Sequence, residues 1–427
     1  MNEHFVREKQ IDITRLDNGF TVATERMPEI ATATLGIWVA TGSRHEQAHE
    51  HGLSHFIEHM AFKGTARRSA RQIAEDIENV GGDINAATSI EYTSYTARVL
   101  GENIDVALDV IGDILSQSVF DAAELAREKG VILQEHAAVE DTPDDLVYDA
   151  FMETAYARQP MGRPILGTPD TIRSFDEATI RDFLAREYTP GKMVLAAAGD
   201  VNHAQIVDAA QKFFGSMPAV ETRGPEAGSY TGGERRIARK LEQANIVLGL
   251  PGLSVRDPSY YATHLFAHIL GGGLTSRLWH EVRETRGLAY SIDAFHWPFS
   301  DCGLFGIGAG TGGSDVANLI DVTLACTREA AGEINEVELA RAKAQMKVAL
   351  LAALESPGGR IERVARQLLS WGRIIPSNDI ITKVDAITVD QVREAGHRLL
   401  QGTPTLSAIG PIKGLPSLEA IEAGLRG

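Results

Sequence analysis

Five histidines lie close together in the segment HEQAHEHGLSHFIEH, residues 45–59. Two imidazoles that are four residues apart on a helix point to the same side and can bind one metal ion. A glutamate beside such a pair can act as the general base toward a water molecule at that metal. The segment therefore predicts a catalytic zinc site and a peptidase.

Two zinc motifs overlap in this segment and compete for the same histidines. Residues 45–55 have the metzincin spacing H-E-x-x-H-x-x-G-x-x-H, in which Glu46 is the base. Residues 55–59 have the inverted spacing H-x-x-E-H, in which Glu58 is the base. Both motifs predict a zinc peptidase, but they assign the chemistry to different residues.

The apolar pattern favours the inverted motif. A helix that holds metal ligands needs an apolar side that packs against the protein, and residues 45–51 offer only Ala48. We therefore expect residues 45–51 to form a solvated loop. The following segment, in which we expect Ser54 to cap a helix, has a complete apolar face of Leu53, Phe56, Ile57 and Met60. This reasoning assigns His55 and His59 as ligands and Glu58 as the base.

The order of similar segments indicates that the chain is an internal duplication. Three segments in the first half recur in the second half at nearly constant separation, which favours duplication over coincidence. The pairs are HFIEHMAFKG with HLFAHILGGG (55–64 and 264–273), ELAREKGVILQE with ELARAKAQMKVA (124–135 and 338–349), and the weaker PGKMVLAAAGDV with PTLSAIGPI (190–201 and 404–412).

The second copy has lost the acid of the motif. It keeps His264 and His268 at the matching places but has Ala267 where the first copy has Glu58. A histidine pair without its glutamate lacks the base of the hydrolytic reaction. We interpret these two histidines as structural relics and expect one zinc ion per chain.

The same comparison points to the third zinc ligand. The second copy has Ala342 and Ala349 where the first has Glu128 and Glu135, so these acids are absent together with the base. Catalytic zinc usually has three protein ligands and one open position. Seven residues are about two helical turns, so Glu128 and Glu135 share a helix face. Either can be the ligand, and the other can orient a histidine.

The arrangement of predicted elements indicates an α+β fold. Residues 216–234 are rich in proline and glycine and are predicted to link a catalytic half, residues 1–215, to a degenerate half, residues 235–427. Runs of strands and runs of helices alternate without a strict βαβ order, which favours mostly antiparallel sheets packed with helices. The first half is predicted to contain strands at 21–26, 34–41, 83–90 and 91–99, and helices at 53–62, 69–80, 103–117 and 121–140.

Four stretches carry a resemblance to a known family: GLSHFIEHMAFKGT, GGDINAATSIEYTSY, EKGVILQE and LGGGLTSRLWHEVRETRGLAY. With them the chain resembles the pitrilysin/insulinase family of inverted-motif zinc peptidases, which includes the catalytic subunit of the mitochondrial processing peptidase and its bacterial relatives. The likeness spans nearly the whole chain, including the duplication. It implies a metalloendopeptidase that cleaves unfolded peptides or presequences in a chamber formed when two homologous halves close like a clamshell.

The resemblance also implies roles for individual residues. Glu135 takes the place of the family's distal zinc ligand, and Glu128 matches its supporting acid. Arg283 and Tyr290, in RETRGLAY, match an Arg/Tyr pair from the second half that contacts the substrate and the developing oxyanion. The run Asn85-Ala86-Ala87-Thr88 matches the edge strand to which an extended substrate adds as another strand.

The composition limits the partners. With 58 acidic and 41 basic residues the formal charge is -17, and no stripe of basic residues with interleaved aromatics suggests nucleic-acid binding. We expect peptide substrates, including basic ones, and no membrane partner. The family often works as two-chain assemblies, so we expect a homodimer, with a distinct partner subunit as the alternative.

Cysteine content and the first residues bear on the compartment. The two cysteines, Cys302 and Cys326, fit a reducing compartment, and MNEHFVREKQIDITRL has no signal-peptide pattern. We expect a cytoplasmic bacterial protein, with the mitochondrial matrix as the alternative.

A non-catalytic partner or scaffold subunit is the second class of function that the resemblance allows. Such relatives have usually lost the zinc-site residues, whereas His55, Glu58, His59 and Glu135 are all present here. Zinc content and peptide cleavage distinguish the two classes.

Overall fold

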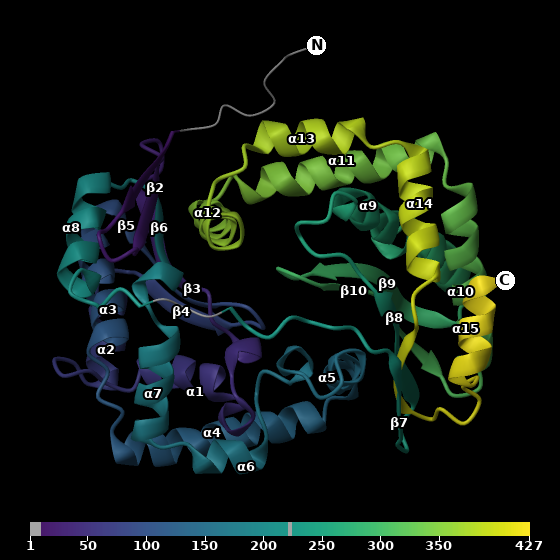
Figure 1. Ribbon diagram of the computed structural model, residues 1–427, viewed down its shortest axis with the longest axis horizontal. Coiled ribbons are helices and arrows are strands. Elements are labelled where there is room, and N and C mark those ends of the chain that lie inside the picture. The colour runs from purple at the N-terminus through teal and green to yellow at the C-terminus, as the bar shows by residue number, and fades with distance from the viewer. Residues whose placement is uncertain (1–9, 221–223) are drawn as a thin grey trace. The chain divides into compact units, whose positions relative to one another are not determined.

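The computed structural model describes residues 10–220 and 224–427, which form two compact units, each built around one sheet (Figure 1). The first unit comprises the described residues of Met1–His136, Pro164–Glu226 and Leu350–Asn378. The second comprises Ala137–Arg163, Ala227–Ala349 and Asp379–Gly427. Residues 221–223 of the predicted linker, and residues 1–9 of the segment without a signal pattern, lie outside the described residues.

The first sheet has six strands in the order β1-β2-β6-β3-β5-β4. Neighbouring strands are antiparallel except β2 and β6, which are parallel, and β4 lies at an edge. The strands are β1 (Ile11–Arg15), β2 (Thr21–Arg26), β3 (Thr32–Val39), β4 (Asp83–Thr88), β5 (Thr93–Leu100) and β6 (Met193–Gly199).

The second sheet repeats this topology. Its order, β7-β11-β8-β10-β9, corresponds to β2-β6-β3-β5-β4 of the first sheet, and β7 and β11 form the same kind of parallel pair. The duplication and the α+β class predicted from the sequence are thus confirmed. The strands are β7 (Gly233–Ala238), β8 (Gln243–Pro251), β9 (Ala289–Pro298), β10 (Gly303–Gly312) and β11 (Thr405–Gly410).

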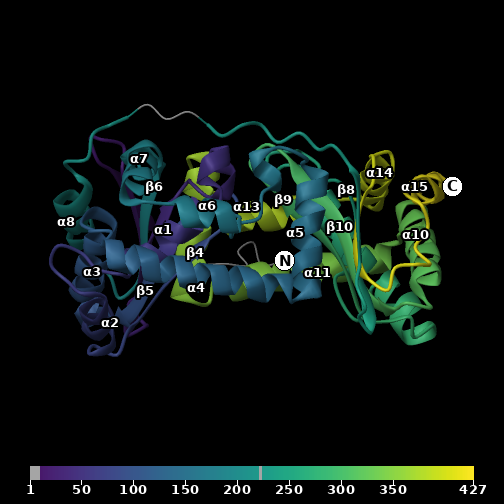
Figure 2. The ribbon, with the colours of Figure 1, turned by 90° about the horizontal axis from the view of Figure 1, so that it is seen from below.

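Eight α-helices accompany the first sheet: α1 (Leu53–Ala61), α2 (Ala70–Glu78), α3 (Ile104–Ser116), α4 (Ala122–Glu140), α6 (Pro169–Ser174), α7 (Glu177–Glu187), α8 (His203–Phe214) and α12 (Pro357–Trp371). The other helices are α5 (Pro143–Ala155), α9 (Tyr260–Gly271), α10 (Val316–Glu333), α11 (Glu336–Ala353), α13 (Ser377–Ala386), α14 (Val389–Leu400) and α15 (Leu418–Arg426). The division between the units falls inside α4, seen along its length in Figure 2, and inside α11, seen in Figure 1.

Two helices are exchanged between the halves of the sequence. Helix α12, late in the chain, covers one face of the first sheet, where Ile361 and Val364 pack in a buried cluster with Trp38 of β3. Helix α5, early in the chain, packs against β7, β8 and β11 of the second sheet, so that a Cβ at Gly249 would meet the Phe151 ring at 2.3 Å. The compact units therefore do not follow a single cut at the predicted linker.

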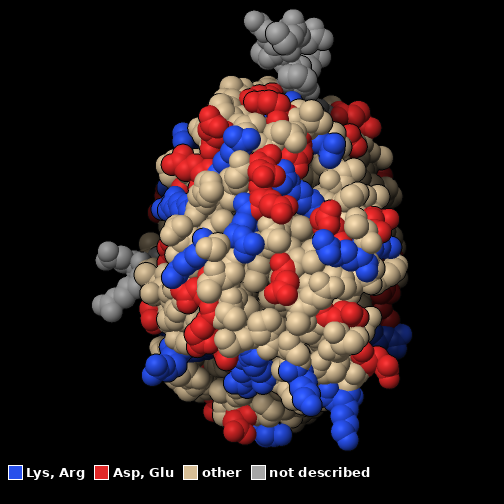
Figure 3. Space-filling model, turned by 90° about the vertical axis from the view of Figure 1, so that its right-hand side faces the viewer, with Lys and Arg blue, Asp and Glu red and all other residues tan. Residues whose placement is uncertain are grey.

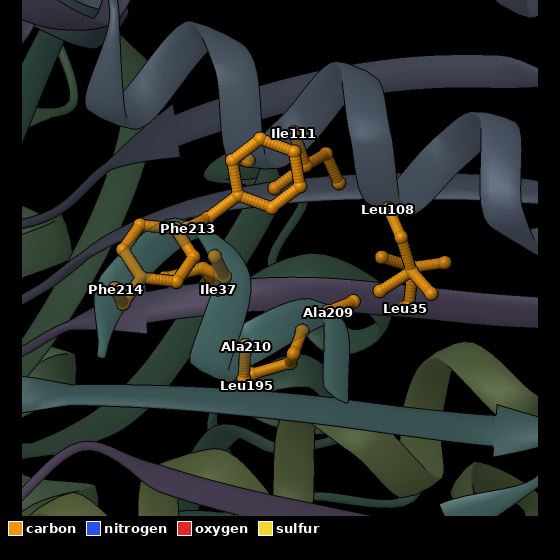
Figure 4. Close-up of a pocket in the computed structure, with 10 residues that line it drawn as sticks. Leu35, Ile37, Leu108, Ile111, Leu195, Ala209, Ala210, Phe213 and Phe214 are labelled. Carbon is orange, nitrogen blue, oxygen red and sulfur yellow. The ribbon is translucent and has the colours of Figure 1, made fainter. Parts of the chain in front are cut away.

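The opposite face of the first sheet packs against α1, α3 and α8 and forms the largest part of that unit's core. A small cavity remains between β3, β6 and helices α3 and α8 (Figure 4). Its lining is apolar: Leu35, Ile37, Leu108, Ile111, Gly112, Leu195, Ala209, Ala210, Phe213 and Phe214. With no polar group to orient a substrate, it is a packing gap and not a second active site.

Surface and helix composition give two further observations. Within the described residues, no helix combines the length and the apolar character needed to cross a bilayer. The face shown in Figure 3 carries acidic and basic side chains interspersed, without a continuous basic patch.

Candidate zinc site

Helices α1 and α4 bring three potential metal ligands together. His55 and His59 lie one turn apart on α1, with ring centroids 4.7 Å apart. Glu135, on α4, places its Oε2 atom 3.7 Å from Nε2 of each histidine. Among the described residues this is the one group of three or more His, Cys, Asp or Glu side chains whose donor atoms converge, all within 4.8 Å of one another. The structure thus assembles the predicted ligand set.

The first histidine is kept neutral by its surroundings. Burial, with a smaller contribution from the neighbouring His59, lowers the pKa of His55 to about 4. A metal ligand must offer an unprotonated nitrogen, so a lowered pKa prepares this imidazole for coordination at neutral pH.

Glu128 supports the second histidine from behind. Its Oε2 atom accepts a hydrogen bond from His59 Nδ1 at 3.1 Å, which leaves Nε2 directed toward Glu135. The carboxylate is only 2% exposed, and its other oxygen lies 2.7 Å from Lys63 Nζ. Sequence reasoning missed Lys63, although its place four residues after His59 could have suggested a shared side.

Glu58 points toward the edge strand β4. The hydroxyl of Thr88, the last residue of β4, donates a hydrogen bond to Glu58 Oε2 at 2.6 Å.

Two buried tyrosines lie near this carboxylate, and their hydroxyls, those of Tyr95 and Tyr188, are 3.0 Å apart in the core. Burial raises the pKa of Tyr188 to about 12 and that of Tyr95 well above its ordinary value, and the charge of Glu58 acts in the same direction. Both phenols therefore stay protonated beside the carboxylate.

The expected solvated loop before α1 is wrong, because much of it is buried. Glu46 is 2% exposed, and its two carboxylate oxygens accept hydrogen bonds from the backbone N–H groups of Gly52 (2.8 Å) and Ser54 (2.7 Å). These donors belong to the start of α1, where N–H groups lack partners within the helix and attract an anion. The expectation that Ser54 caps the helix is also wrong, since Gly52 holds the N-cap position.

Gly52 itself must be glycine. Its φ of +93° is a left-handed conformation that side chains disfavour, and a Cβ there would lie 2.7 Å from Gly167 Cα and from the carbonyl oxygen of Leu166. The start of the ligand helix is therefore fixed both by a buried acid and by close backbone packing.

His45 and His49, the first two histidines of the metzincin spacing, are not part of the site. His45 Nδ1 accepts a hydrogen bond from the Gly42 N–H at 3.1 Å, and burial is the main cause that lowers its pKa to about 4. The His49 side chain is 70% exposed. Neither belongs to the converging group described above.

The second unit holds the predicted Arg/Tyr pair. The guanidinium carbon of Arg283 lies 4.1 Å from the centroid of the Trp279 ring and 4.5 Å from that of Tyr290. Tyr290, near the start of β9, is 76% exposed. Their predicted contacts with substrate stay predictions. Trp279 was missed, because nothing in its spacing reveals that it stacks on Arg283.

The histidines of the second copy lie in a different environment. On α9, His268 Nε2 donates to the side-chain oxygen of Gln345 at 2.7 Å. Burial lowers the pKa of His264, with a smaller contribution from His268. The positions matching the acids of the first copy are Ala342 and Ala349 of α11.

The predicted substrate strand is the edge strand β4. Its side chains alternate, with Asn85 and Ala87 exposed and Ala86 and Thr88 partly buried. Each of these residues pairs on one side with β5. Addition of a peptide to its other side stays a prediction.

Comparison with known families agrees with this architecture. The sequence model described as Insulinase (Peptidase family M16) matches residues 21–169, and the model described as Peptidase M16 inactive domain matches residues 174–346. The chain belongs to peptidase family M16. The predicted resemblance to the pitrilysin/insulinase family is thereby confirmed.

Similar M16 proteins come from bacteria and from mitochondria. An uncharacterized zinc protease of Streptomyces coelicolor is 39% identical over 413 residues, covering 94% of this chain and 89% of that protein. An uncharacterized zinc protease of Bacillus subtilis is 37% identical, covering 94% and 98%. The beta subunit of the mitochondrial-processing peptidase of Saccharomyces cerevisiae is 35% identical, covering 96% and 94%.

Solved structures share the fold. A chain of complex III2 from Candida albicans has a TM-score of 0.88 at 25% identity and covers 97% of this chain and 100% of its own length. A peptidase M16 inactive domain protein from Pseudomonas fluorescens has a TM-score of 0.88 at 22% identity, covering 96% and 100%.

Proposed function

We propose that the protein is a zinc metalloendopeptidase that hydrolyses unfolded peptides or presequences. The observation that carries this proposal is the convergence of His55, His59 and Glu135. Glu58 lies on the same helix as the two histidines. Relatives at 35–39% identity that are named zinc proteases or processing peptidases support it.

The donor set fits zinc. Two imidazole nitrogens and one carboxylate oxygen, here all within 4.8 Å of one another, are a common ligand set of catalytic zinc in hydrolases. Zinc held by these three residues would supply a Lewis acid that activates water for attack at neutral pH. Glu128 holds His59 through Nδ1, and Glu135 supplies the one negative charge among the ligands.

Glu58 then performs the proton transfers. It accepts the proton of the attacking water as the scissile carbonyl is attacked, and it delivers this proton to the leaving amine. A base accepts a proton through a carboxylate oxygen, and the Thr88 hydroxyl donates its hydrogen bond to only one oxygen of Glu58, Oε2. We retain Arg283 and Tyr290 as residues that contact substrate and oxyanion, and residues 85–88 as the strand that receives the peptide.

The experiment measures zinc content and cleavage of a fluorogenic peptide. We expect about one zinc per chain and activity that o-phenanthroline abolishes. Glu58→Gln should keep its zinc and lose about 10²-fold to 10⁴-fold in turnover, because it removes the base and not a ligand. Glu135→Gln should lose most of its metal. Two zinc ions per chain, or an active Glu58→Gln enzyme, would contradict the assignment.

A scaffold subunit is the second candidate, favoured by the likeness to a chain of complex III2. It predicts no turnover on any unfolded peptide. Peptide-library cleavage followed by mass spectrometry separates the two candidates, and it also gives the cleavage-site preference.

The acidic balance of the chain, -17, suggests that substrates include basic peptides. Long-range attraction is screened by salt, so kcat/KM for a Lys/Arg-rich peptide should fall as ionic strength rises. If kcat/KM for the basic peptide changes with salt no more than kcat/KM for a neutral peptide, the negative net charge of the chain does not attract substrate and serves solubility alone. Mass measurement of the purified protein, alone and with candidate partner subunits, tests the proposed homodimer.

A further inference from the structure

The hydrogen bond between Thr88 and Glu58 joins an edge strand to the proposed base. Thr88 Oγ1 donates to Glu58 Oε2 at 2.6 Å, and it also lies 3.5 Å from the carbonyl oxygen of Ser54, one turn before Glu58 on α1. A hydrogen bond of this length to a carboxylate is charge-assisted and among the stronger kinds in proteins.

Both partners are held by regular structure. Thr88 pairs with Thr93 of β5, and the alternation of β4 turns Thr88 and Ala86 toward the protein interior. Threonine is branched at Cβ and has few χ1 conformations in a strand, so its hydroxyl is presented in a fixed direction. Glu58 lies in the middle of α1, whose start is fixed by Glu46.

A free glutamate would lack this restraint. Its carboxylate can rotate about its terminal bond, and either oxygen can face either side. With Oε2 occupied by Thr88, Oε1 is the oxygen that remains to take a proton from water. The hydrogen bond thus selects one orientation of the carboxylate before substrate arrives, and preorganisation of this kind lowers the reaction barrier.

We propose that Thr88 is a positioning residue that orients the Glu58 carboxylate for proton transfer, a role separate from any pairing of its backbone with substrate. This inference rests on the proposed peptidase function. It makes β4 a strand whose last side chain sets the geometry of the base.

The test compares Thr88→Val, Thr88→Ser and Thr34→Val in the zinc-loaded enzyme. Valine keeps the shape and strand preference of threonine but has no hydroxyl, whereas serine keeps the hydroxyl. Thr34 is the matched control, because it lies on β3 of the same sheet and shares with Trp38 the face that packs against α12.

We expect Thr88→Val to bind zinc normally and to lower kcat by about tenfold or more with little change in KM, as loss of a hydrogen bond to a charged group does. Thr88→Ser should restore most of kcat, and Thr34→Val should match the wild type. Crystal structures of the zinc-loaded wild type and Thr88→Val should show that the carboxylate has turned in the variant.

Unchanged kcat in Thr88→Val, a serine variant as impaired as the valine variant, or loss of zinc in proportion to activity would overturn the positioning role. If the wild type and Thr34→Val bind zinc but cleave no peptide, the proposed function fails instead. The two crystal structures then decide the positioning role alone, and an unmoved Glu58 in Thr88→Val would refute it.

Discussion

Glu128 is a buried carboxylate whose two oxygens serve different partners, His59 on one side and Lys63 on the other. A buried charge without a counterion is costly, and the ammonium group of Lys63 supplies that counterion. Glu128 in turn accepts the His59 Nδ1 hydrogen, and a partner of this kind orients a metal-binding imidazole. We therefore expect Lys63 to influence zinc binding indirectly, through Glu128 and His59.

Replacing Lys63 tests this chain of contacts. We expect Lys63→Met to weaken zinc affinity by up to about tenfold, since changes in outer-shell partners cost about 10-fold to 100-fold and Lys63 is one step further away. Competition with a chelator measures the affinity. Lys129→Met is the control. Lys129 follows Glu128 in the sequence, but its Nζ contacts the Arg173 carbonyl oxygen, so its replacement should leave zinc affinity unchanged. Equal weakening in both variants would point to general electrostatics.

The residues of the site differed in how far the sequence could predict them. His55, Glu58 and His59 could be assigned because a helix converts a fixed spacing into a shared face. Glu135 could be narrowed to one of two acids, since the second copy has alanine at both matching positions. The contact of Thr88 with Glu58 joins a strand to a helix 30 residues away, and no local rule gives such a pair.

Helix and strand positions were predicted closely where periodicity is strong, as in α1, α2 and β2. The segment 45–51 was misjudged because a polar composition fits both a solvated loop and a buried network of charges. Within it Glu50 contacts Arg186 at 2.7 Å. Just before it Arg44, only 2% exposed, contacts Glu91 at 2.6 Å. Partners from distant elements, not hydrophobicity, bury this segment.

Because Glu46 is buried and hydrogen-bonded, its substitution should affect the stability of the fold. We expect Glu46→Ala to destabilise the protein by about 1–3 kcal/mol, because two backbone N–H groups at the start of α1 lose their acceptor. Zinc affinity should fall as well, since His55 lies one residue beyond Ser54. Thermal unfolding and chelator competition measure both effects. His49→Gln, at an exposed site, is the control, and a Glu46→Ala protein as stable as this control would contradict the capping role.

His45 makes the same segment sensitive to acid. Burial first, and then the nearby Lys192 and Arg44, lower its pKa from 6.5 to about 4. Between about pH 4 and pH 6.5, His45 therefore binds a proton in the unfolded chain but not in the folded chain. The contribution of neutral His45 to stability is complete above pH 6.5 and is lost as pH falls toward about 4.

The measurement is the free energy of unfolding of the metal-free wild type and His45→Gln. Glutamine cannot take up the proton, so the advantage of the wild type over the variant should shrink between about pH 7.5 and about pH 5. A difference that stays constant, or that grows on acidification, would contradict the assignment of this group.

The exchange of α5 and α12 means that each compact unit is completed by a helix from the other half of the sequence. Such an exchange could not be predicted from the repeats, because they show which segments correspond and not which sheet each helix covers. Sequence order suggested two halves divided at 216–234. Packing divides the same elements differently.

Truncation of a buried residue on α12 tests this division. Ile361→Ala should cost about 2–5 kcal/mol, because it removes buried apolar contacts and leaves a cavity. Hydrogen exchange should then become faster in β2, β3 and β6, which share this cluster, while β8 and β10 stay protected. Val337→Ala on α11, 68% exposed, is the control. Loss of protection confined to the second sheet would contradict the packing described here.

The exchanged helices also bear on how such a gene evolves. Because each sheet packs against a helix from the other copy, deletion of either copy would expose one face of the sheet that remains. The second half has Ala267, Ala342 and Ala349 where the first half has acids, and its helix on the first sheet is by itself a reason for selection to keep it. Recombination at the linker would likewise be penalised, since it separates each sheet from its helix. Architecture, and not only catalysis, therefore ties the inheritance of the two copies together.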